Sequence, residues 1–302
     1  MSKQQPISFF EFQELFSTEE ACQKHLFEIR WPEGFVCPKC LNKQAYKIAY
    51  RNLFECSECG YQASVTAGTI FHKTRTPLRI WFWVIYLVTN DKRGVSAAQV
   101  AAQFNLSYPT AWAMLHKIRK AMGDREAKYF LDEIVEMDDS YFGGPGEGAK
   151  RGRGTDKTPV LSGLSLTKQG YPKFLKMKVV PNLTSKTLVE QAHQIIVSNS
   201  TVSTDLFRSY RQLAKEGFIH EPKEFNAKDN PDHLKWLHTM IANVKAFILG
   251  TYHGVSEKHL QAYLNEYCYR FNRRFFRSEL FNRLLTACAS TETITYAQLM
   301  AN

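Results

Sequence analysis

Two pairs of cysteines constrain the fold of this chain more than any other feature. Cys37 and Cys40 are separated by two residues, Cys56 and Cys59 are spaced in the same way, and fifteen residues lie between the pairs. Two such pairs supply four thiolates for one tetrahedral zinc ion, which is the arrangement of a zinc ribbon. Because protein sulfurs fill all four positions, the predicted zinc is structural.

The chain is long enough for more than one domain, and its charge indicates the kind of partner. It has 302 residues and a formal net charge of +10 at pH 7, which favours a polyanionic partner such as nucleic acid or an anionic surface. No apolar run approaches the length of a membrane span, and the first residues lack the apolar core of a signal peptide. With seven cysteines, four of them paired for metal, we expect a cytosolic protein.

Helical patterns occupy most of the first 122 residues outside the cysteine region. A helix is predicted over 8–30, with a capping box at Ser8 and Glu11, and an aromatic-rich core helix over 78–90. Residues 94–122 fit a helix-turn-helix. Its basic second helix is predicted to contact DNA through Lys117, Arg119 and Lys120. Any helical hairpin with a basic face would look similar.

The stretch from Glu136 to Gly144 combines a strand pattern with acids. It reads as the end of a strand stopped by a Gly-Gly turn. A strand that packs against a core disfavours buried charge, so a carboxylate is retained there most readily when it faces a cation or binds a metal. Asp138 and Asp139 point to opposite faces, so only one of them can share a given site. An edge strand with solvated acids is an equally good interpretation of this stretch alone.

The order of the elements after residue 130 predicts an α/β fold with a mixed sheet. Three strands are followed by a helix, a short strand ending on Asp205, and then helices, with strands expected at 134–142, 160–165, 173–180 and 201–204. Carboxylates on neighbouring strands, such as Asp138 and Asp205, can hold two divalent ions about 4 Å apart for phosphodiester transfer. Hard oxygen ligands suit Mg²⁺ and also Mn²⁺.

Two further basic segments are candidates for DNA contact. Glycines alternate with cations at Lys150, Arg151 and Arg153, which is typical of a loop that grips phosphates, although a disordered surface loop has the same composition. Arg273 and Arg274 lie among phenylalanines, which suggests DNA contact or, alternatively, an aromatic core with a charged rim.

Taken together, these features resemble the zinc-ribbon insertion-sequence transposases of the ISXO type, which have an RNase H-like DDE domain. The resemblance covers 31–282 and rests on the zinc ribbon, the helix-turn-helix and the segments Glu136–Gly144, Ser203–Asp205, Gly250–His253, His259–Tyr263 and Tyr269–Arg274. It implies DNA transposition at terminal inverted repeats, with Asp138 and Asp205 as the first two catalytic carboxylates. Asp139 falls where the family commonly has Glu.

The third metal ligand departs from the wider family pattern. That pattern has a Glu seven residues before a Lys, and here His238 stands seven residues before Lys245. Some members resemble this chain in having His or Asn at this place. A neutral imidazole can ligate a metal, so His238 is the expected third ligand, with Asn243 as the alternative. The resemblance implies that Lys245 contacts the phosphate backbone near the scissile bond.

The resemblance also implies partners. We expect double-stranded DNA (the transposon ends and the target) as the partner, a homodimer or larger assembly on DNA, no membrane, and a nucleoid-associated location in the bacterial cytoplasm. A DNA-binding protein that has lost cleavage is the alternative. The expected domains are an N-terminal helical segment (1–30), the ribbon (31–76), the helix-turn-helix region (77–123), the RNase H-like domain (124–290) and a tail (291–302).

Overall fold

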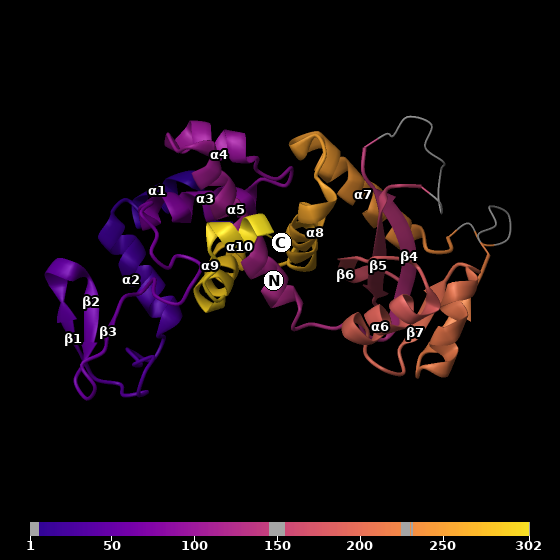
Figure 1. Ribbon diagram of the computed structural model, residues 1–302, viewed down its shortest axis with the longest axis horizontal. Helices are drawn as coiled ribbons and strands as arrows, with labels where there is room; N and C mark the ends of the chain where they lie inside the picture. The colour runs from indigo at the N-terminus through magenta and orange to yellow at the C-terminus, as the bar shows by residue number, and fades with distance from the viewer. Residues whose placement is uncertain (1–5, 145–154, 225–229, 231, 302) are drawn as a thin grey trace. The chain divides into compact units, whose positions relative to one another are not determined.

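The computed structural model describes residues 6–144, 155–224, 230 and 232–301, and it divides into two compact units (Figure 1). The first unit is Met1–Asp124 together with Phe276–Asn302, and the second is Arg125–Phe275. None of the described helices has both the length and the apolar character that crossing a bilayer requires.

The predicted helix over 8–30 is two helices, α1 (Phe9–Leu15) and α2 (Glu19–Arg30). The capping box at the start of α1 is confirmed: Ser8 Oγ accepts from the Glu11 N–H, and Glu11 Oε2 accepts from the Ser8 N–H. The prediction of one continuous helix is wrong, because Thr18 has an extended backbone and its hydroxyl caps a new helix.

The region of the four paired cysteines is a small antiparallel sheet. It consists of β1 (Ala45–Ile48), a 3₁₀ turn η1 (Ala49–Arg51), β2 (Leu53–Cys56) and β3 (Gln62–Ala63). The residues between the two cysteine pairs read as a hairpin with strands at 45–48 and 52–55, and this hairpin is present, with its second strand starting one residue later. Asn52, in the left-handed conformation with φ 50°, makes the turn between β1 and β2.

The rest of the first unit is helical. It consists of α3 (Leu78–Asn90), α4 (Ala97–Phe104), α5 (Tyr108–Glu126, whose last two residues belong to the second unit), a 3₁₀ turn η3 (Arg277–Glu279), α9 (Leu280–Ser290) and α10 (Tyr296–Ala301). Ser96 caps α4, and Asn105 in the left-handed conformation starts the tight turn to α5, as predicted for this pair of helices. The C-terminal α9 returns to pack against α2 and α3, and its Phe281 ring also meets Phe12 of α1 with ring centroids 5.1 Å apart.

The second unit is built on a five-stranded mixed sheet. Its strands are β4 (Ile134–Phe142), β5 (Thr158–Leu166), β6 (Pro172–Val179), β7 (Thr201–Thr204) and β8 (Ile219–Pro222). Their order is β6-β5-β4-β7-β8, with β6, β5 and β4 paired antiparallel and β7 and β8 parallel to β4. This is the sheet order of the RNase H-like fold, so the predicted fold class is confirmed.

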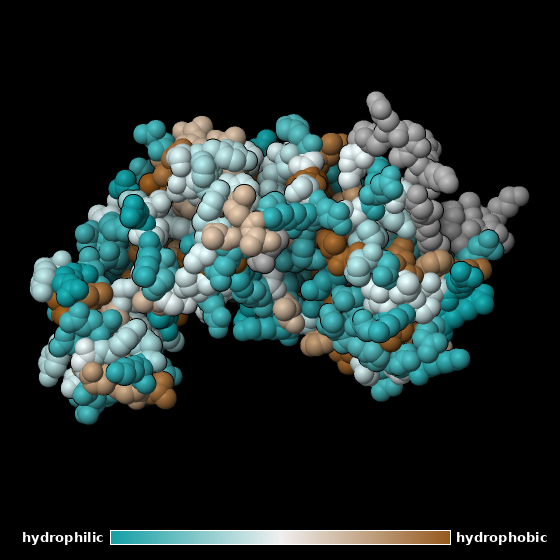
Figure 2. Space-filling view, viewed as in Figure 1, coloured by the Kyte–Doolittle hydropathy of each residue, from teal (hydrophilic) through white to brown (hydrophobic). Residues whose placement is uncertain are grey.

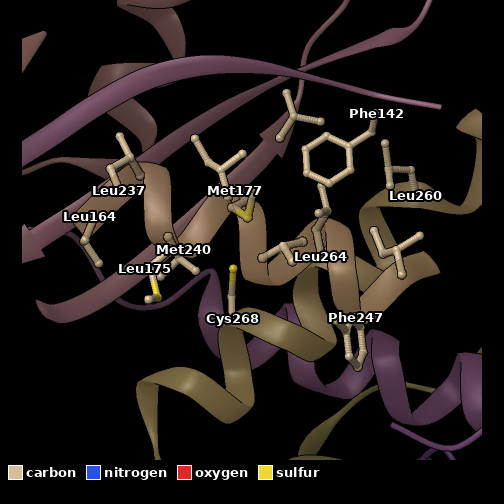
Figure 3. Packing of buried hydrophobic residues seen from close by; sticks show 14 of the residues in the cluster. Phe142, Leu164, Leu175, Met177, Leu237, Met240, Phe247, Leu260, Leu264 and Cys268 are labelled. Carbon is tan, nitrogen blue, oxygen red and sulfur yellow. The ribbon is translucent and has the colours of Figure 1, made fainter. Parts of the chain in front are cut away.

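Helices cover both faces of this sheet. On one face α6 (Ser185–Ile195) and the 3₁₀ helix η2 (Arg208–Lys215) pack on Val135 and Met137 of β4. On the other face α7 (Lys235–Tyr252) and α8 (Glu257–Asn272) form a core with the sheet, part of which Figure 3 shows. The visible surface of this unit is largely hydrophilic, with small, scattered apolar patches (Figure 2).

A buried polar cluster ties the end of α5 to β6 and the end of α8. The Glu126 carboxylate forms an ion pair with Arg273, whose side chain is 9% exposed, and also accepts from Asn272 Nδ2. The Asn272 amide in turn bonds both the N–H and the C=O of Leu175 on β6. Glu126, Asn272 and Arg273 are all buried, so water cannot replace either partner of the ion pair as a source of compensating charge.

We expect Glu126→Ala to destabilise the protein by about 3–5 kcal/mol, because it leaves the buried Arg273 guanidinium without its counter-ion. Glu28→Ala is the matched control, since its pair with Lys24 is exposed and contributes about 0.5 kcal/mol or less. Urea unfolding of both variants measures the difference. Equal midpoints for the two variants would show that the buried pair contributes no more than the exposed one.

Candidate active site and zinc centre

The four cysteines of the ribbon form one compact cluster. Their sulfurs all lie within 4.8 Å of one another, with Cys37 Sγ 3.6 Å from Cys59 Sγ and Cys40 Sγ 3.5 Å from Cys56 Sγ. Four sulfurs around a zinc with Zn–S bonds of 2.3 Å would be about 3.8 Å apart, so the cluster fits this ion. Tight turns produce the arrangement, as the Leu41 N–H bonds the Cys37 C=O and the Gly60 N–H bonds the Cys56 C=O.

The thiol acidities also favour a cation at this place. The backbone N–H of Cys59 lowers the pKa of Cys56 to about 6. The Asn42 N–H lowers the pKa of Cys40, but the neighbouring Cys59 and Cys56 sulfurs outweigh this and raise it to about 12. Crowded sulfurs resist ionising together unless a metal ion neutralises them, and zinc supplies that charge.

In the second unit, Asp138 and Asp139 point to opposite faces of β4, as the alternation predicts. Asp138 Oδ2 lies 3.2 Å from His238 Nε2 on α7. Asp139 Oδ1 instead accepts from the Tyr210 hydroxyl of η2, at 3.3 Å, on the other face of the sheet. Asp138 is therefore the acid that shares a site with α7.

Asp205 follows β7, directly beside β4. The parallel register pairs Ile134 with Thr201 and Glu136 with Ser203, so Asp205 follows that last pair by two residues on its strand, as Asp138 does on β4. Asp205 Oδ1 accepts from the Phe207 N–H at 3.0 Å, which fixes the carboxylate at the strand end.

The pKa of His238 is shifted by the acids near it. Its hydrogen bond to Asp138 raises its pKa, partial burial opposes this, and the charges of Asp138, Glu136 and Asp205 raise it further. Of these three acids, Asp138 is the one whose contact with His238 is direct, at 3.2 Å.

Lys245 and Asn243 lie on different sides of α7. At 3.6 residues per turn, Lys245 is about 20° around the helix from His238, whereas Asn243 is about 140° away. Lys245 Nζ lies 5.4 Å from the ring centroid of Phe142 at the end of β4. Burial lowers the pKa of Lys245, Lys157 lowers it further, and Asp138 opposes both.

The face of the sheet around Asp138 has polar groups that suit a hydrated ion. Ser162 on β5 is paired with Asp138, and Ser140 follows two residues later on β4. Both hydroxyls are buried, and neither has a hydrogen-bond partner among the described residues. Carboxylate, imidazole and hydroxyl groups are ligand types that Mg²⁺ and Mn²⁺ accept, although among the described residues only the four cysteines converge as a group of three or more possible ligands.

Glu136 is a functional candidate that the sequence reasoning missed. It shares the face of β4 with Asp138, and its Oε2 accepts from the Leu237 N–H at 2.8 Å. Burial raises its pKa, while the Leu237 bond and His238 act in the opposite direction. The signal was present in the sequence, since an acid two residues before Asp138 must point to the same side of a strand.

The predicted DNA contacts of the two helical segments are mostly engaged within the protein. Arg119 and Arg273 are buried, with 2% and 8% of their surface exposed, so their assignment as phosphate contacts is corrected. Buried guanidinium groups must be paired internally, as Arg273 is with Glu126.

The remaining predicted cations are partly exposed or lie outside the described residues. Lys117 Nζ donates to the Ile70 C=O at 3.2 Å, and Lys120 forms an ion pair with Asp124 at 2.6 Å. Arg274 donates to the main-chain oxygens of Phe271, Lys173 and Pro172. Lys150, Arg151 and Arg153 lie outside the described residues.

Comparison with known proteins identifies the family of both regions. Residues 17–62 match the family model described as a transposase zinc-ribbon domain, and residues 130–272 match an ISXO2-like transposase domain. Together the matched ranges cover more than half of the chain.

Two curated proteins resemble the chain in sequence. A Halobacterium salinarum protein, named as an uncharacterized protein in transposable element ISH50, is 26% identical over 286 residues, or 87% of this chain and 93% of that protein. An uncharacterized transposase-like protein of Haemophilus influenzae is 29% identical over 104 residues, which are 34% of this chain and 84% of that protein.

Solved structures resemble the chain only weakly. A Mos1 transposase paired-end complex aligns with a TM-score of 0.29 and 13% identity, covering 69% of this chain and 78% of that chain. A simian T-cell lymphotropic virus intasome has the same TM-score and 11% identity, covering 56% and 63%. The fold therefore follows from the sheet order and not from these alignments. The four-cysteine cluster, the order of the sheet and both family matches agree: the chain carries a transposase zinc-ribbon domain over residues 17–62 and an ISXO2-like transposase domain over residues 130–272.

Proposed function

We propose that this transposase binds the terminal inverted repeats of an insertion sequence and catalyses divalent-metal-dependent cleavage and transfer of DNA strands. The observation that carries the proposal is the 3.2 Å contact between Asp138 and His238, two residues 100 positions apart on a strand and a helix. The parallel register of β4 and β7, which pairs Glu136 with Ser203, supports including Asp205 in the proposed site.

Each residue has a distinct task in this proposal. Asp138, Asp205 and His238 hold Mg²⁺ or Mn²⁺, which when bound activates the attacking oxygen and stabilises the leaving one. Lys245, on the same side of α7 as His238, contacts the DNA phosphate near the scissile bond. The hydroxyls of Ser140 and Ser162 are available to water in the site.

One observation favours a second candidate, a DNA-binding protein that has lost cleavage. His238 occupies the place where the wider group has an acid, and the Asp138 carboxylate favours its protonated form. An imidazolium ion cannot ligate a metal. Nicking of a cognate duplex distinguishes the two candidates.

The partners, the assembly and the location that we propose are those expected of this family of transposases. The partners are double-stranded DNA ends and target DNA, the working form is a homodimer or larger assembly on DNA, and the location is the nucleoid in the bacterial cytoplasm. Lys117, Lys120 and Arg274 stay proposed DNA contacts through their partly exposed surfaces. Lys150, Arg151 and Arg153, outside the described residues, stay proposed contacts on their charge alone.

We expect His238→Ala to lower Mg²⁺-dependent cleavage at least about tenfold, because one metal ligand is lost. His238→Glu is expected to keep or raise activity in Mg²⁺, since a carboxylate suits this ion better than imidazole. Because the pKa of His238 is raised above 6.5, wild-type activity should fall as pH is lowered through that raised value. His238→Glu should persist to lower pH, as a Glu carboxyl has an ordinary pKa of about 4.3.

Asn243→Ala is the matched control, since Asn243 lies on the same helix but on another side. The measurement is the rate of nicking of an inverted-repeat duplex from pH 5 to 9, where the range is set by the ordinary His pKa of about 6.5. If His238→Ala cleaves like the wild type and Asn243→Ala is inactive, Asn243 is the third ligand.

A further inference from the structure

The first turn of α7 has no capping residue of its own. The first N–H groups of a helix need acceptors from outside the helix, and the N-cap side chain usually supplies one. Here the N-cap is Leu234, which has a left-handed backbone and makes no side-chain hydrogen bond to the helix. The acceptor comes instead from Glu136, whose Oε2 takes the Leu237 N–H at 2.8 Å from a strand 101 residues earlier.

This bond joins the two elements that carry the proposed metal ligands. Glu136 stands two residues before Asp138 on the same face of β4, and Leu237 directly precedes His238 on α7. The Leu237 side chain is fully buried in the core under α7, so its backbone cannot move independently of that core (Figure 3). Glu136 is itself only 6% exposed. A shift of the first turn of α7 would therefore change the 3.2 Å separation of His238 from Asp138.

We propose that Glu136 is a positioning residue, which caps α7 from the sheet and so holds His238 against Asp138 as a metal ligand. The inference rests on the proposed function, because it concerns the same metal site. Its basis is the hydrogen bond and not the charge, so an amide oxygen at this position can do the same work. Groups that orient a metal ligand typically contribute about 10- to 100-fold to metal affinity or activity.

The test is the Mn²⁺ affinity of the purified full chain, measured by electron paramagnetic resonance without DNA. Glu136→Ala removes the acceptor and is expected to weaken Mn²⁺ binding about 10- to 100-fold. Glu136→Gln keeps an acceptor oxygen and should bind Mn²⁺ within about threefold of the wild type. Glu136→Asp keeps the charge but shortens the reach by one methylene, so it should resemble Glu136→Ala. Circular dichroism verifies that each variant is folded.

Glu19 provides a matched control elsewhere in the chain. Its carboxylate also caps a helix from outside, accepting from the Leu78 N–H at 2.8 Å and the Arg79 N–H at 3.0 Å at the start of α3. Glu19→Ala should lower the urea midpoint by about as much as Glu136→Ala does and leave Mn²⁺ affinity unchanged. If the role of Glu136 were only structural, Glu136→Ala would likewise lose stability and keep its Mn²⁺ affinity.

Two outcomes would overturn the inference. Unchanged Mn²⁺ affinity in folded Glu136→Ala would show that the cap does not position His238. A loss in Glu136→Gln as large as in Glu136→Ala, with Glu136→Asp binding normally, would show that the charge serves the metal directly. Asp138→Asn distinguishes a failure of this inference from a failure of the proposed function. If Asp138→Asn binds Mn²⁺ as tightly as the wild type does, the proposed metal site itself is contradicted.

Discussion

Asp138→Asn and Asp205→Asn are each expected to abolish DNA strand cleavage while leaving DNA binding intact. Asn preserves the shape of the side chain but removes the negative charge that holds the proposed metal ions. The metals contribute several kcal/mol of transition-state stabilisation, and each 1.4 kcal/mol is a factor of about ten in rate. The loss should therefore exceed about a thousandfold in a nicking assay, with unchanged affinity in a gel-shift assay.

Asp139→Asn provides the control for charge and position. Asp139 is adjacent in sequence, but its side chain bonds Tyr210 on the opposite face of the sheet. We expect this variant to retain most of its cleavage activity. Inactivity of Asp139→Asn together with activity of Asp138→Asn would assign the site to the other face of β4 and contradict the account.

Cys37→Ser and Cys56→Ser are expected to release zinc and unfold the ribbon. Binding of a structural zinc supplies about 10–16 kcal/mol in isolated zinc-finger peptides, and that energy is folding energy. The strands of the ribbon have four, four and two residues, which is too little sheet to be stable alone. Specific DNA binding should be lost with the fold of the ribbon. The measurements are zinc content by atomic emission and chemical-shift dispersion of the ribbon amides.

Cys22→Ala is the control for this prediction. Cys22 is a buried thiol of α2 outside the cluster, so its loss should leave the zinc content at one ion per chain. A zinc-free wild-type protein that is nevertheless folded would contradict the structural role of the cluster.

Features encoded by local spacing were predictable from the sequence. The cysteine pairs predicted the ribbon, and the alternation along Glu136–Phe142 predicted that Asp138 and Asp139 face opposite sides. The order of strands and helices predicted the mixed sheet. Each of these depends on residues close together in the chain or on the period of one element.

Features that depend on distant partners were not predictable in the same way. Arg273 reads as a surface cation among phenylalanines, and its burial depends on Glu126, 147 residues earlier. Glu136 reads as one more acid in a strand, and its proposed task depends on Leu237, 101 residues later, where α7 lacks a side-chain cap. No local pattern contains either partner. The His238 position was found from its spacing to Lys245, but only the structure sets it beside Asp138.

The most direct test of the central claim is nicking of a duplex that carries the terminal inverted repeat, with the wild-type protein in Mg²⁺, in Mn²⁺ and in EDTA. The account predicts cleavage at the repeat end with either ion, none with EDTA, and none with Asp138→Asn, Asp205→Asn or their combination. If the wild type binds the repeat specifically but does not nick it with either ion at any pH, the protein is a DNA-binding protein without a working metal site.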